Sequence, residues 1–416
     1  MPNRRPGRHA LLFIFLTVLI DVTGLGIIIP VMPDLVQALT GRTVAEAAVI
    51  GGRLIFVYAL MQFICAPIVG GLSDHFGRRP MLLLSLAGFS IDYFLMGFAP
   101  TLGWLFLGRI LSGVFGATYT TAGAYIADVS PPEKRAQNFG LIGAAFGLGF
   151  IVGPALGGII GKHLGVHAPF IVAGALALAN LVYGFIVLPE TLKPENRRAF
   201  SLGRANPLGS LAHMRLYPAV LGLLGAFFLF QLGHQAYTAV WSYFTIERFE
   251  WDEALVGYSL GAIGIAGALV QGGLTRSIIP RLGEAKTLYL GFALAIVSYF
   301  GFGLATQGWM IYAWIPVAGL AGLIGPALQG LMANRVPDDS QGELQGAVAS
   351  LRSLSSIIGP VVLTSIFART SAPDAAVYLP GSPFLVGGAL TVLALVVAAR
   401  VLARRRDARE APSTAP

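Results

Sequence analysis

The stretch LLLSLAGFSIDYFLMGF, residues 82–98, carries a single charged residue, Asp92. Apolar runs of about 20 residues are long enough to cross a hydrocarbon core of ~30 Å as an α-helix. The whole chain has the same character, since 55% of its 416 residues are hydrophobic and 12% are charged, whereas soluble domains carry roughly 25% charged residues. The runs are too long for the alternating strands of about ten residues that build a membrane β-barrel. We therefore predict an all-α integral membrane protein.

Apolar segments of the same length recur on both sides of this stretch. Six lie in the first half of the chain, at residues 10–33, 47–72, 80–99, 102–127, 136–161 and 168–188. Six more follow a polar, proline-containing stretch, at residues 219–245, 254–275, 287–305, 309–333, 344–367 and 382–402. We predict twelve transmembrane helices in two six-helix bundles, divided as an amino-terminal bundle at 1–188, a cytoplasmic linker at 189–218 and a carboxyl-terminal bundle with a basic tail at 219–416.

The positions of Lys and Arg predict the orientation, because positively charged loops stay in the cytoplasm. Most of the 28 Lys and Arg residues fall on the side of the two termini, and the opposite side holds only Arg42, Lys162, Arg248 and Arg369. We therefore expect both termini to be cytoplasmic. The net charge of +8 is then mainly a topology signal, which indicates contact with anionic lipid headgroups of the bilayer and no nucleic-acid partner.

The two halves resemble each other when the chain is shifted by the 206 residues that separate Gly77 from Gly283. IVGP at residues 151–154 then meets IIGP at 357–360. Because six helices return the chain to its starting side, the two copies have the same membrane orientation. This is a parallel repeat, as in two-bundle transporters with a site near the midplane.

The intramembrane acids belong to the first half alone, because Asp92 aligns with Ser298 and Asp21 with Phe227. Asp92 comes twelve residues after Pro80, which places it ~18 Å deep, and Asp21 lies at a similar depth. A charge there costs ~3 kcal/mol, so such acids usually face a cavity and exchange protons. We predict Asp21 and Asp92 as proton-coupling residues. The alternative is a protonated acid that only links two helices.

Other polar residues inside the apolar segments are candidates for the same cavity. Arg109 is a candidate charge partner for the acids, and the alternative is a side chain that extends to the outer face of the membrane. Arg352 lies nine residues into its segment, a depth that favours a place in the cavity wall over such an extension. For His234 the alternatives are a group that titrates near neutral pH and a hydrogen-bonding side chain of the cavity wall. The predicted substrate-binding residues are Gln62, Gln231, His234, Gln235 and Arg352.

Two further motifs predict moving parts. GGLSDHFGRRP, residues 70–80, places Asp74 beside Arg78 and Arg79 in a tight turn, where an acid could meet a helix amino terminus and the guanidinium groups could meet Asp128. Such a latch could form in one state and break in the other. GFIVGPALGG, residues 149–158, is rich in glycine, which indicates either close helix packing or a seam between moving bundles. The predicted gating residues are Asp74, Arg78, Arg79, Asp128, Gly153 and Pro154.

Several chemistries are not supported by the sequence. No G-x-x-x-x-G-K-[ST] motif for ATP is present, so uphill transport would use a proton gradient and no cofactor. Cys65 is the only cysteine, which excludes a disulfide framework. No nucleophile, base and orienting group recur together, so we expect no enzyme activity.

On these motifs the chain resembles the major facilitator superfamily. GGLSDHFGRRP is similar to its motif A, LGRILSGVFGA to motif B, and GFIVGPALGG to the motif C of drug antiporters. Other stretches resemble the tetracycline efflux branch, namely YALMQFICAP, IDYFLMGFAP, FGLGFIVGP, PALQGLM and QGELQGAVASLRSLSSIIGP. The chain departs from the family pattern at several positions. Gly267 and Ala295 stand where tetracycline pumps carry His and Asp, and His75 stands where motif A has Arg. Arg352 stands where the family has a small polar residue.

The resemblance implies the major facilitator fold and proton-coupled export of an amphipathic drug-like compound such as tetracycline, which a divalent metal could accompany. It also implies functional positions at Asp21, Asp92 and Arg109 and a bacterial cytoplasmic membrane location. Two alternatives remain open at this point. One is a proton-linked or facilitative uptake carrier for a sugar or organic anion, with Arg352 as the anchor of the substrate charge. The other is a non-transporting membrane scaffold or receptor.

Overall fold

The computed structural model describes residues 8–116, 118–130, 132–192, 194–197, 214–337 and 340–410, and it is helical through most of these ranges. The chain divides into two compact units. Unit 1 comprises Met1–Asn206 and Thr245–Gly264, and unit 2 comprises Pro207–Phe244 and Ile265–Pro416. Residues 193 and 198–213 of the predicted linker lie outside the described ranges. The division into an amino-terminal bundle that ends at residue 188 and a carboxyl-terminal bundle that begins at residue 219 remains a prediction.

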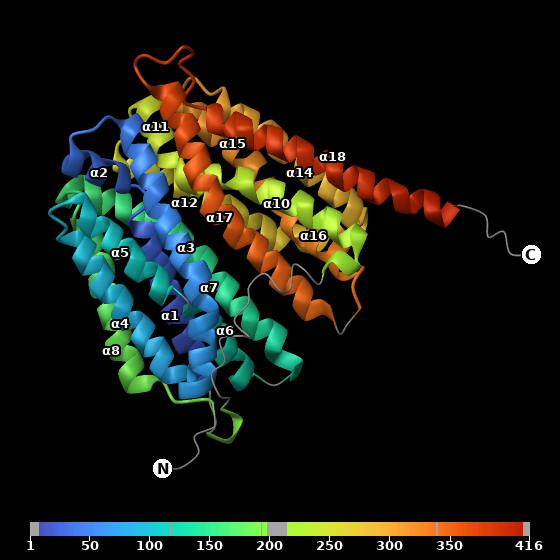
Figure 1. Ribbon diagram of the computed structural model, residues 1–416, viewed down its shortest axis with the longest axis horizontal. Helices are drawn as coiled ribbons and strands as arrows, with labels where there is room; N and C mark the ends of the chain where they lie inside the picture. Colours follow the sequence, from blue (N-terminus) through green and yellow to red (C-terminus); the bar gives the residue numbers. More distant parts are fainter. Residues whose placement is uncertain are drawn as a thin grey trace, which may run out of the picture. The chain divides into compact units, whose positions relative to one another are not determined.

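Unit 1 contains the first eight helices of the chain (Figure 1). They are α1 (Arg8–Ile27), α2 (Met32–Thr40), α3 (Val44–Phe76), α4 (Arg78–Gly97), α5 (Leu102–Phe115), α6 (Thr118–Val129), α7 (Pro132–Leu164) and α8 (Ala168–Val187). Helix α1 packs on α7 and α8, α4 packs on α5 and α8, and α3 packs on α5. A short 3-10 turn, η1 (Pro194–Asn196), follows the bundle.

Unit 2 contains most of the remaining helices. In chain order the elements are η3 (Met214–Leu216), α10 (Pro218–Ala239), α11 (Trp241–Phe249), α12 (Glu253–Leu269), η4 (Val270–Leu274), α13 (Thr275–Leu282), α14 (Glu284–Gly303), α15 (Gly308–Leu320), η5 (Ala321–Leu323), α16 (Ile324–Ala333), α17 (Gln341–Ser371) and α18 (Ser382–Glu410). Helix α10 packs on α17 and α18, and α14 packs on α15, α16 and α18. The Thr245–Gly264 segment, with the end of α11 and the start of α12, belongs to unit 1.

The predicted fold class is confirmed. Among the described residues, ten helices are long and apolar enough to span a membrane, or eleven if the bent pair Leu12–Ile27 and Met32–Thr40 counts as one span. The pair bends by 47°. The fourth predicted span is shorter as a continuous helix, Leu102–Phe115, and helix resumes at Thr118. The prediction of twelve helices therefore missed the breaks within the first and fourth spans.

The internal repeat is visible in the helix boundaries. Helices α4 and α14 begin and end at positions that coincide after the same 206-residue shift. Gly77 precedes α4 with φ 113° and Gly283 precedes α14 with φ 76°. Both are backbone conformations that L side chains rarely adopt, so glycine is required at each turn. A side chain at Gly77 would also overlap the Glu190 carboxylate.

Candidate functional site

Asp92 is fully buried on α4, with no exposed surface. The hydroxyl of Ser112, on α5, donates a short hydrogen bond to its Oδ2, and its Oδ1 has no partner in the described structure. Gly108 allows this approach of α5, because a Cβ at that position would lie 2.7 Å from Oδ1. The carboxyl group is thus held between two helices by one donor.

Arg109 lies one turn from Ser112 on the same face of α5 and is only 6% exposed. Its guanidinium interacts electrostatically with Asp92. The Nη2 atom lies 3.0 Å from Met96 Sδ, and Nε has no hydrogen-bond partner among the residues that the structure describes. The structure therefore buries Arg109 beside Asp92, and the alternative of an arginine extended to the membrane surface is wrong for this arrangement.

Asp21 lies on α1, 7% exposed, and neither of its carboxylate oxygens has a hydrogen-bond partner among the described residues. The ring of Tyr93 lies against Gly24, one turn along α1. Tyr58 and Tyr93 both lie close enough to interact electrostatically with Asp21, Asp92 and Arg109. These five residues form one buried group, which we call the acid cluster, and it joins α1, α3, α4 and α5.

Gln62 lies at the edge of the acid cluster. Its Nε2 donates to the Tyr58 hydroxyl at 3.2 Å and to the backbone carbonyl of Gly116 at 3.1 Å. Both bonds fix the side chain between α3 and the end of α5. The structure thus places this predicted substrate-binding residue beside the acid cluster, and its contact with substrate remains a prediction.

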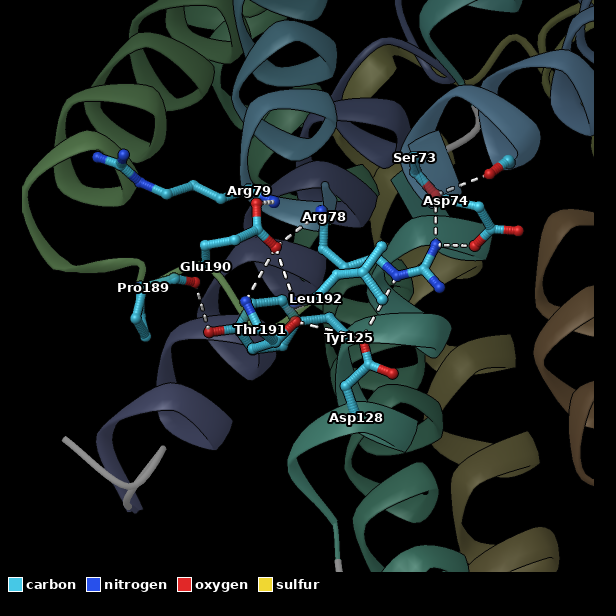
Figure 2. A network of polar contacts seen from close by, with 11 residues as sticks. Ser73, Asp74, Arg78, Arg79, Tyr125, Asp128, Pro189, Glu190, Thr191 and Leu192 are labelled. Atoms are coloured by element: carbon cyan, nitrogen blue, oxygen red, sulfur yellow. Dashed lines mark hydrogen bonds and ion pairs between the residues drawn. The ribbon is translucent and has the colours of Figure 1, made fainter. Parts of the chain in front are cut away.

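Arg78 is the centre of a second polar network at the turn between α3 and α4 (Figure 2). Its Nη1 lies 2.5 Å from Asp74 Oδ1 and 2.6 Å from the Ser73 hydroxyl, and its Nε lies 3.3 Å from Asp128 Oδ2. The expected contact of a guanidinium group with Asp128 is present for Arg78. Arg79 differs, because its Nη2 donates to the Phe185 carbonyl at 2.8 Å.

Glu190 is a residue that the sequence analysis missed. Its carboxylate accepts hydrogen bonds from the backbone amides of Arg78 and Arg79, at 3.0 and 3.2 Å, and of Thr191 and Leu192, at 2.9 and 3.0 Å (Figure 2). The first turn of a helix leaves its amides without partners and favours an anion. The expectation that Asp74 would meet this amino terminus is therefore wrong, since Asp74 pairs with the Arg78 side chain instead.

Gly153 and Pro154 lie on α7 where it crosses α1. A Cβ at Gly153 would lie 2.7 Å from the Thr23 carbonyl, and one at Gly26 would lie 2.8 Å from Pro154 Cδ. On another side of α7, Gly257 at the start of α12 abuts the Pro154 carbonyl too closely for any side chain. The glycines therefore serve close backbone packing within unit 1, and a gating role remains a prediction.

The predicted residues of unit 2 lie on α10 and α17. Gln235 is 9% exposed and its Nε2 donates to the Ser356 hydroxyl at 3.0 Å. His234 is exposed, with its ring 5.8 Å from the Phe230 ring and 5.1 Å from the Tyr237 ring. Gln231 is half-buried one turn earlier on α10. Arg352, exposed on α17, lies within electrostatic reach of His234.

Known proteins resemble this chain along most of its length. Residues 14–360 match the model of the Major Facilitator Superfamily. The class C tetracycline resistance protein of Escherichia coli is 40% identical over 93% of this chain and 96% of its own length. The class G protein of Vibrio anguillarum is 38% identical over 95% and 98%. The crystal structure of the human organic anion transporter MFSD10 (TETRAN) is similar with a TM-score of 0.71 at 23% identity, over 95% of this chain and 100% of that one.

These likenesses agree with the multi-pass helical structure. Among the described residues, no group of three or more His, Cys, Asp or Glu side chains is placed to hold a metal ion. The chain belongs to the Major Facilitator Superfamily of membrane transporters, with tetracycline resistance proteins among its relatives.

Proposed function

We propose that this protein is a proton-coupled antiporter that exports an amphipathic, tetracycline-like compound across the bacterial cytoplasmic membrane by alternating access, with both termini in the cytoplasm. The observation that carries the proposal is the carboxyl group of Asp92, fully buried in a candidate span with one hydroxyl donor and Arg109 beside it. An ionised carboxylate at such a depth is costly, which favours a proton that binds and leaves in each cycle.

Asp21 supports the same mechanism. Its two oxygens have no protein donor within the described structure, and Tyr93 lies both beside Asp92 in the chain and against α1 near Asp21. A proton or a polar group of the substrate could satisfy these oxygens in turn. The names of the relatives supply the substrate class, since the class C and class G proteins are tetracycline resistance proteins.

The driving force is sufficient for export. One proton that moves through 100 mV supplies ~2.3 kcal/mol, which corresponds to a substrate gradient of roughly fifty-fold.

The test uses everted membrane vesicles with an acidic interior, to which tetracycline and Mg²⁺ are added. Wild type should release protons and accumulate tetracycline, and Asp92→Asn should do neither. Asp374→Asn, which removes an exposed acid from the loop after α17, is the matched control and should behave as wild type. Proton-coupled accumulation by Asp92→Asn equal to that of wild type would contradict the proposal.

A second function, proton-linked uptake of an organic anion, is favoured by one observation. Arg352 lies within a span and has no ion-pair partner among the described residues. Accumulation of an organic anion from an acidic medium into right-side-out vesicles, with no export of tetracycline, would establish uptake in place of export.

A further inference from the structure

An open cavity with four polar side chains in its wall lies on unit 2, lined by α16, α17 and the π-helical turn η4. Its volume is 460 Å³, within the range of roughly 300–1,000 Å³ that is typical of small-molecule sites. Its polar lining consists of Gln271, Gln329, Gln345 and Arg352, and the rest of the wall is glycine, proline and alanine. Small residues leave room for a ligand beside the polar groups.

Arg352 brings a positive charge to this cavity. It lies eleven residues after the start of α17, about 17 Å along the helix, within the candidate span Gln341–Ser371. No carboxylate of the described residues forms an ion pair with it. A guanidinium group at such a depth costs ~3 kcal/mol by insertion scales. A bound anion would offset this cost.

The glutamines are placed to complete an anion site. Gln329 Nε2 donates to Gln345 Oε1 at 2.9 Å, which links α16 to α17 and leaves the Gln345 amide nitrogen available as a donor. Gln345 and Arg352 are seven residues apart, so both lie on one face of α17. Gln271 lies on a π-helical turn, a distortion that frequently marks functional sites.

The repeat shows that this polar lining belongs to the second half alone. After the 206-residue shift, Gln271, Gln329, Gln345 and Arg352 coincide with Cys65, Gly123, Phe139 and Phe146. None of the four counterparts is charged or carries an amide. The first half has the reverse specialisation, because its Asp21 and Asp92 coincide with Phe227 and Ser298. Asp21 and Asp92 therefore belong to the first repeat, together with Arg109, whereas Arg352 and the three glutamines belong to the second.

We infer that this cavity recognises the anionic group of an amphipathic organic substrate. Arg352 binds the carboxylate or enolate, because a planar guanidinium offers paired donors that match two oxygens. The amide nitrogens of Gln271 and Gln345 donate to the oxygens of the anion itself, or to a hydroxyl or carbonyl group next to it. This inference rests on the proposed function and names the class of substrate that the transporter takes.

The experiment compares three probes with the same ring system, namely 2-naphthoate, 2-naphthamide and 2-naphthylmethylammonium. Full-length protein in lipid nanodiscs is titrated with each probe by equilibrium dialysis. Wild type should bind 2-naphthoate at least tenfold more tightly than the neutral and cationic probes. Arg352→Gln should lose about tenfold in affinity for 2-naphthoate with little change for the amide, as expected when a charged hydrogen-bond partner is removed.

Two further variants make the result specific. Arg53→Gln removes another arginine, exposed near the start of α3, and should retain the affinity of wild type for 2-naphthoate. Gln345→Ala keeps Arg352 and should weaken 2-naphthoate binding, so the test does not depend on the folding of Arg352→Gln alone. Equal affinity for 2-naphthoate in wild type, Arg352→Gln and Gln345→Ala would overturn the inference, as would a wild type that prefers the cation or binds no 2-naphthoate.

The outcome is separable from that of the proposed function. Wild-type vesicles could show no proton-coupled export while wild-type protein binds 2-naphthoate more tightly than Arg352→Gln does. That result would contradict the proposed export and support the anion site. Alternatively, Arg352→Gln could export with proton coupling as well as wild type does, while wild type shows no preference for 2-naphthoate over the other probes. That result would overturn the anion site and leave the proposed export intact.

Discussion

The carboxylate of Glu190 lies 3.0 Å from the backbone nitrogen of Arg78, 112 residues earlier in the chain. The same group binds the amides of Arg79, Thr191 and Leu192. The end of the first half of the chain is thereby attached to the amino terminus of α4. Arg78 takes part twice, because its side chain also joins Asp74 and Asp128.

Glu190→Gln should destabilise unit 1 by ~1 kcal/mol, the usual cost of losing a good amino-terminal cap. The amide keeps one oxygen as an acceptor but loses the charge that complements the helix terminus. Thermal unfolding in detergent, followed by intrinsic fluorescence, measures the change. Asp374→Asn removes an exposed acid from a loop and should leave the melting temperature unchanged. Identical melting temperatures for the two variants would show that the cap contributes nothing.

Ser112→Ala should reduce proton-coupled export about tenfold or more, because it removes the hydrogen bond from Ser112 to Asp92 and bonds to charged groups contribute ~1.5–3 kcal/mol. Ser112→Thr retains a hydroxyl and should keep most of the activity. The matched control is Ser90→Ala, which removes a buried hydroxyl of α4 that donates to the Gly174 carbonyl at 3.2 Å. If both alanine variants export equally well in everted vesicles, the Ser112 hydroxyl has no role in coupling.

Gly157→Ala should sharply lower the yield of folded protein, because a Cβ there would overlap the Ile27 carbonyl of α1. Overpacking of this kind typically costs 1–3 kcal/mol, and here the neighbour is backbone. Gly143→Ala, on the same helix, meets nothing within 4 Å and should be tolerated. Size-exclusion profiles and melting temperatures of the two variants provide the comparison. A normal profile for Gly157→Ala would mean that α1 and α7 can separate at no cost.

Asp252 and Lys162 make a pH-dependent contact. Their Oδ2 and Nζ atoms lie 2.7 Å apart, and the hydrogen bond from Lys162 lowers the pKa of Asp252 below its ordinary value of 3.8. A lowered pKa means that the ionised form is favoured in the folded protein, so the stabilisation is present above 3.8 and is lost as the pH falls through the lowered value.

The melting temperature of Asp252→Asn should therefore be below that of wild type at pH 7, and the difference should disappear at strongly acidic pH. Because both side chains are substantially exposed, the effect should be small and should weaken in high salt. A difference that persists unchanged at low pH would indicate a contribution of Asp252 other than its charge.

Counting residues within apolar runs predicted much of the fold. The helix that carries Asp92 and the agreement of its bounds with those of α14 follow from the length of the apolar run and from spacing along one chain. The partners of Asp92 were only half predicted. Arg109 was named from its charge, whereas Ser112 was overlooked although it lies three residues later on the same helix face.

Glu190 was not predicted for a different reason. It lies in PETLK, which reads as the polar start of a linker, and its contact with Arg78 depends on how the ends of α3 and α8 are brought together in space. The cavity of unit 2 was predicted only in part, because its lining also forms only when separate segments meet in space. Arg352 was identified from its depth, but Gln271, Gln329 and Gln345 come from three separate segments, and the π-helical turn at Gln271 leaves no simple signal in the periodicity.

The network around Glu190 also bears on how the protein is made. Every group in it, from Ser73 to Leu192 (Figure 2), belongs to the first half of the chain. Chains are synthesised from the amino terminus, and early segments generally fold first. The cap on α4 can therefore close while the second repeat is still on the ribosome. The growing chain would then hold a completed cytoplasmic turn, and with it a fixed orientation, before any helix of the second half enters the membrane.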